Sequence, residues 1–230
     1  MPKRYGAKEK DQVVDHIIGQ LLIGKLRTGE RIDRNEIARE LSLSRLPVTE
    51  AIGQLEHDGI VTSRYHRGSF VERFDPATVL EHHEVYGVLS GMASARAAVY
   101  PTPRIIDTLS ELVRELREAC GSERFEQTTW AYRRAINYEY AGPRLQAAIR
   151  ASQSFIPAAF WVNYKGNQAI MLPYYELEHA AILRRDPVAA RAACEDRSTT
   201  MARVVVAELV RRGVFESAQG VTPTEAMATR

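Results

Sequence analysis

The chain has 230 residues, and 45% of them are hydrophobic, so it can build substantial cores in one or two domains. Its formal net charge of +2 is by itself weak evidence of nucleic-acid binding. The sequence shows neither a signal peptide nor an apolar run near the roughly 18 residues that a membrane span requires, so we expect a cytoplasmic protein without membrane contacts.

A first helix is predicted to begin at Asp11, after the polar segment 1–10. Its apolar residues recur every three or four positions, which places them on one face of a helix. This stripe consists of Val13, Val14, Ile17, Ile18, Leu21 and Leu22. The stretch Gly24–Gly29 ends the helix, and we expect the helix to pack beneath the elements that follow it.

Residues 34–57 are predicted to form two helices joined by a tight turn. Ser44 is placed to cap the second helix, and Pro47 is tolerated in its first turn, where amide groups have no partner within the helix. The second helix has one buried stripe and one face in solvent. The stripe consists of Val48, Ala51, Ile52 and Leu55, and the solvent face carries Arg45, Leu46, Thr49, Glu50 and Gly53.

A β-hairpin is predicted next, with strands Ile60–Arg64 and Ser69–Arg73 joined by a turn at 65–68. Its basic side chains are Arg64, Arg67 and Arg73. A helix–turn–helix beside a basic hairpin suits a DNA major groove and its phosphate backbone, which is the winged-helix arrangement. The charge distribution agrees, because residues 1–73 hold 13 Lys and Arg against 11 Asp and Glu, whereas residues 74–230 hold 18 of each.

Base-reading residues are expected on the solvent face of the second helix. Arg45 can make two hydrogen bonds to guanine, and Leu46 and Thr49 can contact thymine methyl groups or make weak hydrogen bonds. The residues expected mainly at phosphates or in the minor groove are Arg34, Asn35, Arg64, His66 and Arg67. Ser44 and Gly68 complete the predicted set of DNA-contacting residues.

The segment from Ala77 to Gly213 is predicted to be entirely helical, after the connector Phe74-Asp75-Pro76. The expected helices are 77–100, 103–120, 123–141, 143–163, 168–185 and 187–212. They are separated at Pro101/Pro103, Gly121, Gly142-Pro143, Lys165-Gly166 and Asp186-Pro187. The predicted fold class is therefore mostly α, with a winged helix–turn–helix domain over 11–73 and an all-helical domain over 77–213.

The two cysteines, Cys120 and Cys194, are far apart in sequence and lack the spacing of a metal site, so we expect reduced thiols. The sequence also lacks a glycine-rich phosphate loop, a nucleophile elbow and a paired-carboxylate motif. Since no residues form a convincing acid–base or nucleophile set, the protein is not expected to be an enzyme.

A series of fixed spacings runs through residues 11–73. They are Gly24-x-Leu26-x-x-Gly29-Glu30-x-Ile32, Glu36-Ile37-Ala38, Leu43-Ser44-Arg45-x-Pro47-Val48-x-Glu50-Ala51, Leu55-x-x-x-Gly59 and Arg67-Gly68-x-x-Val71. This pattern resembles the DNA-binding domain of the GntR family of bacterial transcription regulators. Leu46 stands where the family usually has Thr, and Thr49 stands where it has Arg. The second departure removes a side chain that can read guanine.

An all-helical domain after such a winged helix resembles the FadR-like branch of this family, whose effector domain is a bundle of six or seven helices. The resemblance implies a pocket that in most members holds a metal through Asp-x-x-x-His on one helix and two further histidines on the last two helices. Residues 131–135 and 142–145 look like the family's Phe-His-Arg and Asn-Pro-x-Leu segments. This match places Thr129 at the Asp position, Arg133 at the first His position, Tyr175 or His179 at the second, and Arg197 at the last.

Two guanidinium groups cannot ligate a divalent cation and would repel one, so we expect that the family's metal site is lost and that no cofactor binds. Arginine suits a carboxylate or phosphate through paired, charge-assisted hydrogen bonds. A pocket of Thr129, Arg133, Tyr175, His179 and Arg197 would then bind a small anionic effector. In the alternative, the arginines form structural ion pairs with Glu139, Glu176, Glu178 or Glu195, and a residual metal role through His179 is the third interpretation.

The resemblance implies a sequence-specific transcription regulator, more often a repressor in this family. It would bind a double-stranded DNA operator as a homodimer and respond to a small anionic metabolite such as an organic acid. Two alternatives remain open at this point. One is an architectural or metal-dependent DNA-binding regulator without an organic effector, and the other is a helical-bundle enzyme with an appended winged helix.

Overall fold

The computed structural model describes residues 5–153 and 168–216. The chain forms two compact units. The N-terminal unit contains the chain up to Val79 together with the chain from Val205 onward, and the helical unit contains Leu80–Val204. Two long helices, α4 (Pro76–Val99) and α10 (Pro187–Arg211), therefore contribute residues to both units.

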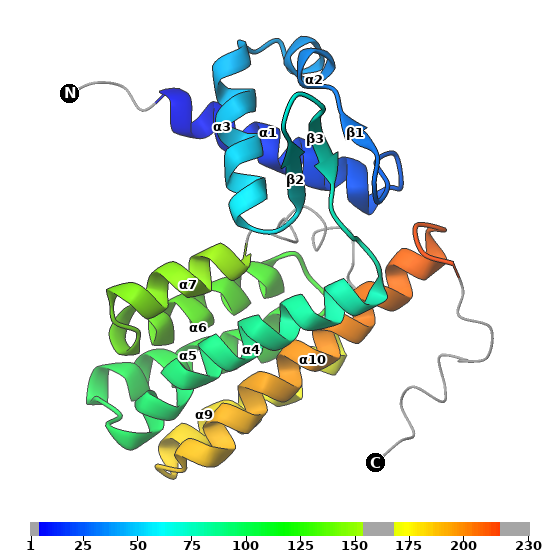
Figure 1. The fold of residues 1–230 in the computed structure, drawn as a ribbon. Helices are drawn as coiled ribbons and strands as arrows, with labels where there is room; N and C mark the ends of the chain where they lie inside the picture. The colour runs from blue at the N-terminus through cyan, green and yellow to red at the C-terminus, as the bar shows by residue number, and fades with distance from the viewer. Residues whose placement is uncertain (1–4, 154–167, 217–230) are drawn as a thin grey trace. The chain divides into compact units, whose positions relative to one another are not determined.

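Three helices form most of the N-terminal unit (Figure 1): α1 (Tyr5–Leu22), α2 (Arg34–Glu40) and α3 (Arg45–His57). α1 packs against α3, and the two predicted apolar stripes are buried in the core between them. α1 begins at Tyr5 and not at the predicted Asp11. The polar segment before Asp11 contains Ala, Lys and Glu, which are strong helix formers and extend the helix.

The starts of α2 and α3 differ in their capping. Asp33 caps α2, because its Oδ1 accepts hydrogen bonds from the backbone amides of Asn35 and Glu36 at 2.8 and 3.1 Å. The amides of Glu36 and Asn35 lower the pKa of Asp33 by stabilising its charged form. Ser44 is the N-cap of α3, as predicted, but its side chain makes no capping hydrogen bond. Its hydroxyl is thus left exposed at the start of α3.

A small antiparallel sheet forms the wing. Its strands are β1 (Arg31–Ile32), β2 (Val61–Arg64) and β3 (Gly68–Val71), in the order β1-β3-β2, with Arg64 opposite Gly68 and Val61 opposite Val71. The hairpin was predicted, but β1 was not, because two residues are too short to show an alternating pattern. Gly68 has a φ of +98°, and a Cβ at this position would lie 3.1 Å from Arg31 Nε, so both the backbone and the β1 side chain favour glycine.

Six described helices build the bundle: α4, α5 (Pro103–Ala119), α6 (Arg124–Tyr140), α7 (Pro143–Gln153), α9 (Gln168–Leu183) and α10. Their starts confirm the breaks predicted at Pro103, Gly142-Pro143 and Asp186-Pro187. The second half of the predicted 143–163 helix and the break at Lys165-Gly166 lie outside the described residues. The fold class, a winged helix–turn–helix followed by an all-helical bundle, is confirmed.

The core of the helical unit lies where α5 packs against α6 and α9. Leu109, Leu116, Tyr132, Ile136 and Ile182 are almost completely buried there. None of the helices that the structure describes has the length and apolarity needed to cross a membrane.

α4 and α10 approach each other closely. A Cβ on Gly87 of α4 would lie only 2.9 Å from Ser198 Cβ of α10. The Ser198 hydroxyl donates a hydrogen bond of 2.6 Å to the backbone carbonyl of His83, one turn earlier on α4. Gly87 therefore permits a contact between backbones that a larger residue would separate.

Candidate functional site

The exposed face of α3 is the first candidate site. Its buried stripe fixes the helix to the core, and Arg45, Leu46 and Thr49 project into solvent on the other side, with 67% of Leu46 exposed. The Thr49 hydroxyl donates to the backbone carbonyl of Arg45 at 3.0 Å. Since its hydroxyl is used within the helix, Thr49 offers chiefly a methyl group outward. The face thus combines one guanidinium group with apolar groups.

The wing lies beside this face and is hydrogen-bonded to α2. Arg34 donates through Nη2 to the Oγ of buried Ser69 at 2.6 Å, and Ser69 Oγ lies 3.2 Å from Ser63 Oγ. The guanidinium carbon of Arg64 lies 4.8 Å from the centroid of the Phe70 ring. Arg67 is exposed, and so is Asn35 on α2. These contacts hold the side chains of Arg34 and Arg64 against strand β3.

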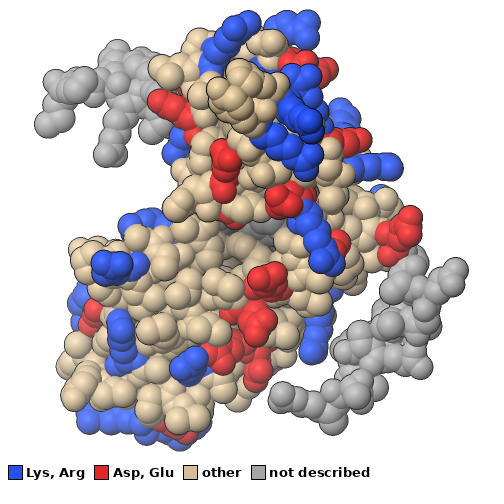
Figure 2. Space-filling model, viewed as in Figure 1, with Lys and Arg blue, Asp and Glu red and all other residues tan. Residues whose placement is uncertain are grey.

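The wing tip carries a residue that sequence reasoning did not select. Tyr65 is 89% exposed, and its ring centroid lies 3.9 Å from that of His66, which has a φ of +56°. The sequence signal that could have selected Tyr65 is an aromatic residue placed in a turn between Arg64 and His66. Figure 2 shows that Lys and Arg side chains gather at the end of this unit where α2, β1 and the β2–β3 turn lie.

A buried ion pair lies inside the helical bundle. Arg133 of α6 is 3% exposed and donates through Nη1 to Oε1 of Glu178, which is fully buried on α9, at 2.5 Å. Ser94 of α4 donates to the same carboxylate oxygen at 2.5 Å and accepts from Arg133 Nη2 at 3.2 Å. Although burial opposes it, the pKa of Arg133 is raised, with Glu178 as the largest favourable contribution. The predicted alternative of a structural ion pair thus applies to Arg133.

Arg197 of α10 is the second buried guanidinium group, with 6% of its surface exposed. Its Cζ lies 4.5 Å from the centroid of the Tyr175 ring, and its Nη2 lies 3.4 Å from the sulfur of buried Cys194. Cys194 also lies 3.5 Å from Arg133 Nη1, so one thiol bridges the two arginines. Among the described residues, no carboxylate forms an ion pair with Arg197.

The other two predicted pocket residues do not join this cluster. The Thr129 hydroxyl donates to the Glu126 carbonyl on its own helix at 2.7 Å. His179 Nε2 lies 3.1 Å from Ser110 Oγ on α5, and burial, assisted by Arg117, lowers the pKa of His179. Of the two alternatives for the second histidine position, the structure places Tyr175 and not His179 beside Arg197.

These residues do not fit a divalent cation. Arg133 and Arg197 offer only donors, and Glu178 is already engaged by Arg133 and Ser94. Within the described ranges, the structure brings together no group of three or more His, Cys, Asp or Glu that could hold a metal ion.

Several polar atoms in the bundle interior are buried without a hydrogen-bond partner among the residues 5–153 and 168–216. They are Ser90 Oγ, Tyr132 OH, Arg133 Nε, Glu178 Oε2 and Arg197 Nε. Burial also raises the pKa of Tyr132 well above its ordinary value, so its hydroxyl stays a donor. The cluster of two arginines and one glutamate therefore has one excess positive charge, unfilled donors and one unfilled acceptor, Glu178 Oε2.

Comparisons with known proteins address the chain as a whole. A family model described as "Bacterial regulatory proteins, gntR family" matches residues 9–71. The chain is 59% identical over 223 residues to an uncharacterized HTH-type transcriptional regulator of Mycobacterium tuberculosis, a match that covers 97% of this chain and 91% of the relative. It is 33% identical over 87 residues to a probable D-xylose utilization operon transcriptional repressor of Paenarthrobacter nicotinovorans, covering 38% of each chain.

Two solved structures have similar folds. McbR/YncC of E. coli matches with a TM-score of 0.61 and 22% identity, over 87% of this chain and 98% of that chain. Lar of Listeria monocytogenes matches with a TM-score of 0.56 and 14% identity, over 92% and 99%. At these identities the similarity concerns the arrangement of the elements and not the residues of the sites.

Proposed function

Because this chain belongs to the GntR family of bacterial regulatory proteins and is a DNA-binding transcription regulator, we propose that it acts as a homodimeric repressor whose DNA affinity changes when a small anion binds. Its site of action is then the cytoplasm, where the operator DNA lies. The repressor part takes support from the Paenarthrobacter nicotinovorans relative, which is named a probable repressor.

The DNA-binding part of the proposal rests on the exposed face of α3. Its buried stripe leaves Arg45, Leu46 and Thr49 as the outward groups, and the wing places Arg64 and Arg67 nearby. A helix of this kind fits a major groove, where a guanidinium group can read guanine and apolar groups can contact thymine methyls. The wing arginines suit the phosphates beside it.

Helix α4 supports the homodimer. It exposes an apolar seam of Val85, Val88, Met92 and Val99, with half-buried Ala95 between the last two. The steps between these residues alternate between three and four, which is the spacing of a helix that packs against a second helix. Two copies of α4 could bury this seam around a twofold axis and so present two winged helices to the two half-sites of a pseudo-palindrome.

Met92→Glu should convert the dimer into monomers. It places an unpaired charge at the centre of the seam, which should weaken dimerisation at least about 100-fold. Sedimentation velocity at micromolar concentration would measure the change. Leu177→Glu on α9 is the matched control, since Leu177 is also an exposed apolar residue of the helical unit. A dimer that persists in Met92→Glu, or that is lost equally in the control, would contradict the α4 interface.

The environment of Arg197 supports the proposed response to an anion. It is buried without a carboxylate partner in the described part of the chain, whereas Arg133 is already paired with Glu178. An uncompensated buried charge is costly, and a small carboxylate or phosphate beside Arg197 would neutralise it. The same anion could accept hydrogen bonds from Arg197 Nε and Tyr132 OH. The ligand would then favour one arrangement of the helices, which regulation requires.

A panel of small organic acids should contain at least one that raises the melting temperature of the wild type and changes its operator affinity. At a concentration of 100 times the dissociation constant, the stabilisation should reach about 2.7 kcal/mol. Arg197→Met should remove both effects and leave operator binding without ligand unchanged. Arg203→Met, at an exposed site on the same helix, is the control. The proposal fails if no acid acts on the wild type, or if Arg197→Met responds as the wild type does.

A further inference from the structure

The turn between β2 and β3 presents two ring side chains at the tip of the wing. The backbone amide of Arg67 donates to the carbonyl of Arg64 at 2.9 Å, which makes Tyr65 and His66 the two central residues of the turn. His66 has a φ of +56°, a conformation that glycine adopts readily and most other residues do not. The ring centroids of Tyr65 and His66 lie 3.9 Å apart, so the Tyr65 ring has a neighbour that limits its orientations.

Tyr65 combines high exposure with a backbone conformation that is costly at the next residue. Among the described residues it is the most exposed large hydrophobic residue, at 89%. Within the same ranges its hydroxyl forms no hydrogen bond. Both features coincide at the point of the wing that lies farthest from its base. A strained turn that holds an amphipathic ring in solvent indicates a contact with another molecule.

The charges around the tip select DNA as that molecule. Arg67 is exposed, and the guanidinium carbon of Arg64 lies 4.8 Å from the centroid of the Phe70 ring. Phe70 pairs with Thr62, so Arg64 is directed back along the hairpin and not toward the tip. The arginines suit phosphates, whereas a phenol ring gains little from a phosphate. The tip therefore presents a ring whose contact must lie beyond the phosphate backbone.

The length of the hairpin suits the minor groove that borders the site of α3. Figure 1 shows the β2–β3 hairpin alongside α3 within the N-terminal unit. Each of the two strands has four residues and so extends about 13 Å, similar to the roughly 12 Å width of the major groove. With α3 in the major groove, the tip would lie at the edge of that groove. Arg67 could then contact the phosphate backbone while Tyr65 reaches past it.

A tyrosine ring in the minor groove can distinguish A·T from G·C. The groove is about 6 Å wide, and its floor offers only acceptors at A·T, whereas G·C adds the exocyclic amino group of guanine. The Tyr65 hydroxyl could donate to an acceptor at A·T, and its ring could pack between the groove walls. At G·C the amino group would occupy the space that the hydroxyl needs. The chemistry of the ring thus favours A·T.

We propose that Tyr65 enters the minor groove beside each half-site and makes the base pair there A·T in preference to G·C. Tyr65 is then a specificity-determining residue, whereas Arg67 contributes affinity through a phosphate. This assignment rests on the proposed function, in which α3 lies in the major groove. It concerns base pairs that flank those contacted by α3.

Base analogues separate the two grooves experimentally. The probe is a duplex selected by the full chain from a random-sequence library, in which each pair flanking a half-site is replaced in turn. Inosine·cytosine has the major groove of G·C but lacks the minor-groove amino group, whereas diaminopurine·thymine has the major groove of A·T and carries that group. At one flanking pair, the wild type should bind A·T and inosine·cytosine about 5-fold or more tightly than G·C and diaminopurine·thymine. Fluorescence anisotropy at one salt concentration measures the four affinities.

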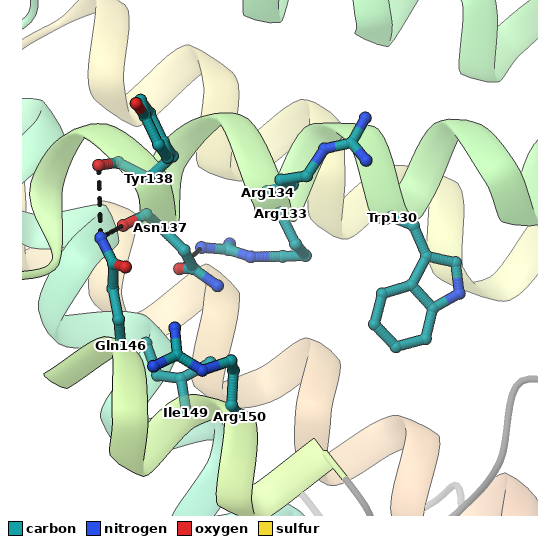
Figure 3. A pocket seen from close by; sticks show the side chains of 8 residues that line it. All are labelled: Trp130, Arg133, Arg134, Asn137, Tyr138, Gln146, Ile149 and Arg150. Atoms are coloured by element: carbon teal, nitrogen blue, oxygen red, sulfur yellow. Dashed lines mark hydrogen bonds between the residues drawn. The ribbon is translucent and has the colours of Figure 1, made fainter. Parts of the chain in front are cut away.

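Tyr65→Ala should reduce this ratio to below about 2-fold and leave the preference at the pair read by Arg45 unchanged. Since the Tyr65 side chain is exposed, the variant should fold as the wild type does. Tyr138→Ala is the matched control. Tyr138 is 76% exposed near the end of α6 (Figure 3), and this variant should keep the full ratio.

The assignment of Tyr65 fails if no flanking pair shows this grouping, if Tyr65→Ala keeps it, or if Tyr138→Ala loses it as well. Grouping by the major groove, with A·T beside diaminopurine·thymine, would assign the position to α3 and remove Tyr65 from base reading. Each of these results leaves the placement of α3 intact when Arg45→Ala still relaxes the preference at its own base pair. If Arg45→Ala relaxed the preference at no pair, the placement of α3 would fail instead.

Discussion

Arg133→Ala should lower the free energy of unfolding by about 3–5 kcal/mol, because it leaves the carboxylate of Glu178 buried without its partner. Glu178 is fully buried, and after the substitution only Ser94 would still donate to it. The loss is a large fraction of the 5–15 kcal/mol that is typical of a folded protein. Urea denaturation followed by circular dichroism would measure it.

Two controls distinguish the ion pair from general damage to the core. The double variant Arg133→Met with Glu178→Leu should recover most of the loss, since apolar pairs of similar volume often replace buried ion pairs without cost. Arg117→Ala removes an exposed pair with Glu176, whose Arg117 Nε–Glu176 Oε1 distance is also 2.5 Å, and should cost under about 1 kcal/mol. If the double variant lost as much as the sum of the two single variants, the pair would not be coupled in the folded protein.

Arg45→Ala should reduce operator affinity by about 1–3 kcal/mol for each half-site and relax the preference at one base pair in each. The reason is that Arg45 carries the guanidinium group on the exposed face of α3, where Leu46 and Thr49 cannot replace two hydrogen bonds to guanine. Fluorescence anisotropy over a library of binding sites would measure both affinity and preference.

Arg67→Ala on the wing is the comparison for Arg45→Ala. Loss of a phosphate contact should weaken all DNA sequences similarly and reduce the slope of log affinity against log salt by about one per protomer. If Arg45→Ala also weakened every sequence in the library evenly, Arg45 would be a phosphate contact and the base reader would lie elsewhere.

Much of the fold could be predicted because its signals are local. The apolar stripes of α1 and α3 and the breaks at Pro103 and Pro143 follow from spacing and backbone chemistry alone. β1 could not be predicted, since its two residues become a strand only by pairing with β3. The close contact of Gly87 with Ser198 likewise depends on two helices that are distant in sequence.

The interior of the bundle was only partly predictable. The family resemblance placed Arg133 and Arg197 near one another, but it could not select one carboxylate among four. The signal for Glu178 was present in α9, where Met171, Tyr175, Glu178 and Ile182 are spaced by four, three and four residues on one buried face. The same spacing selects Tyr175 over His179. The roles of Ser94 and Cys194 depend on tertiary packing and have no local signal.

Helix α4 runs without a break from the N-terminal unit to the buried ion pair. Ser94 joins the buried ion pair, and about 18 residues earlier the first turn of the same helix, from Pro76, belongs to the N-terminal unit. At about 1.5 Å per residue, these positions are roughly 27 Å apart along one continuous hydrogen-bonded rod. Because Ser94 and Pro76 belong to one helix, no loop lies between the buried ion pair and the residues of α4 that belong to the N-terminal unit.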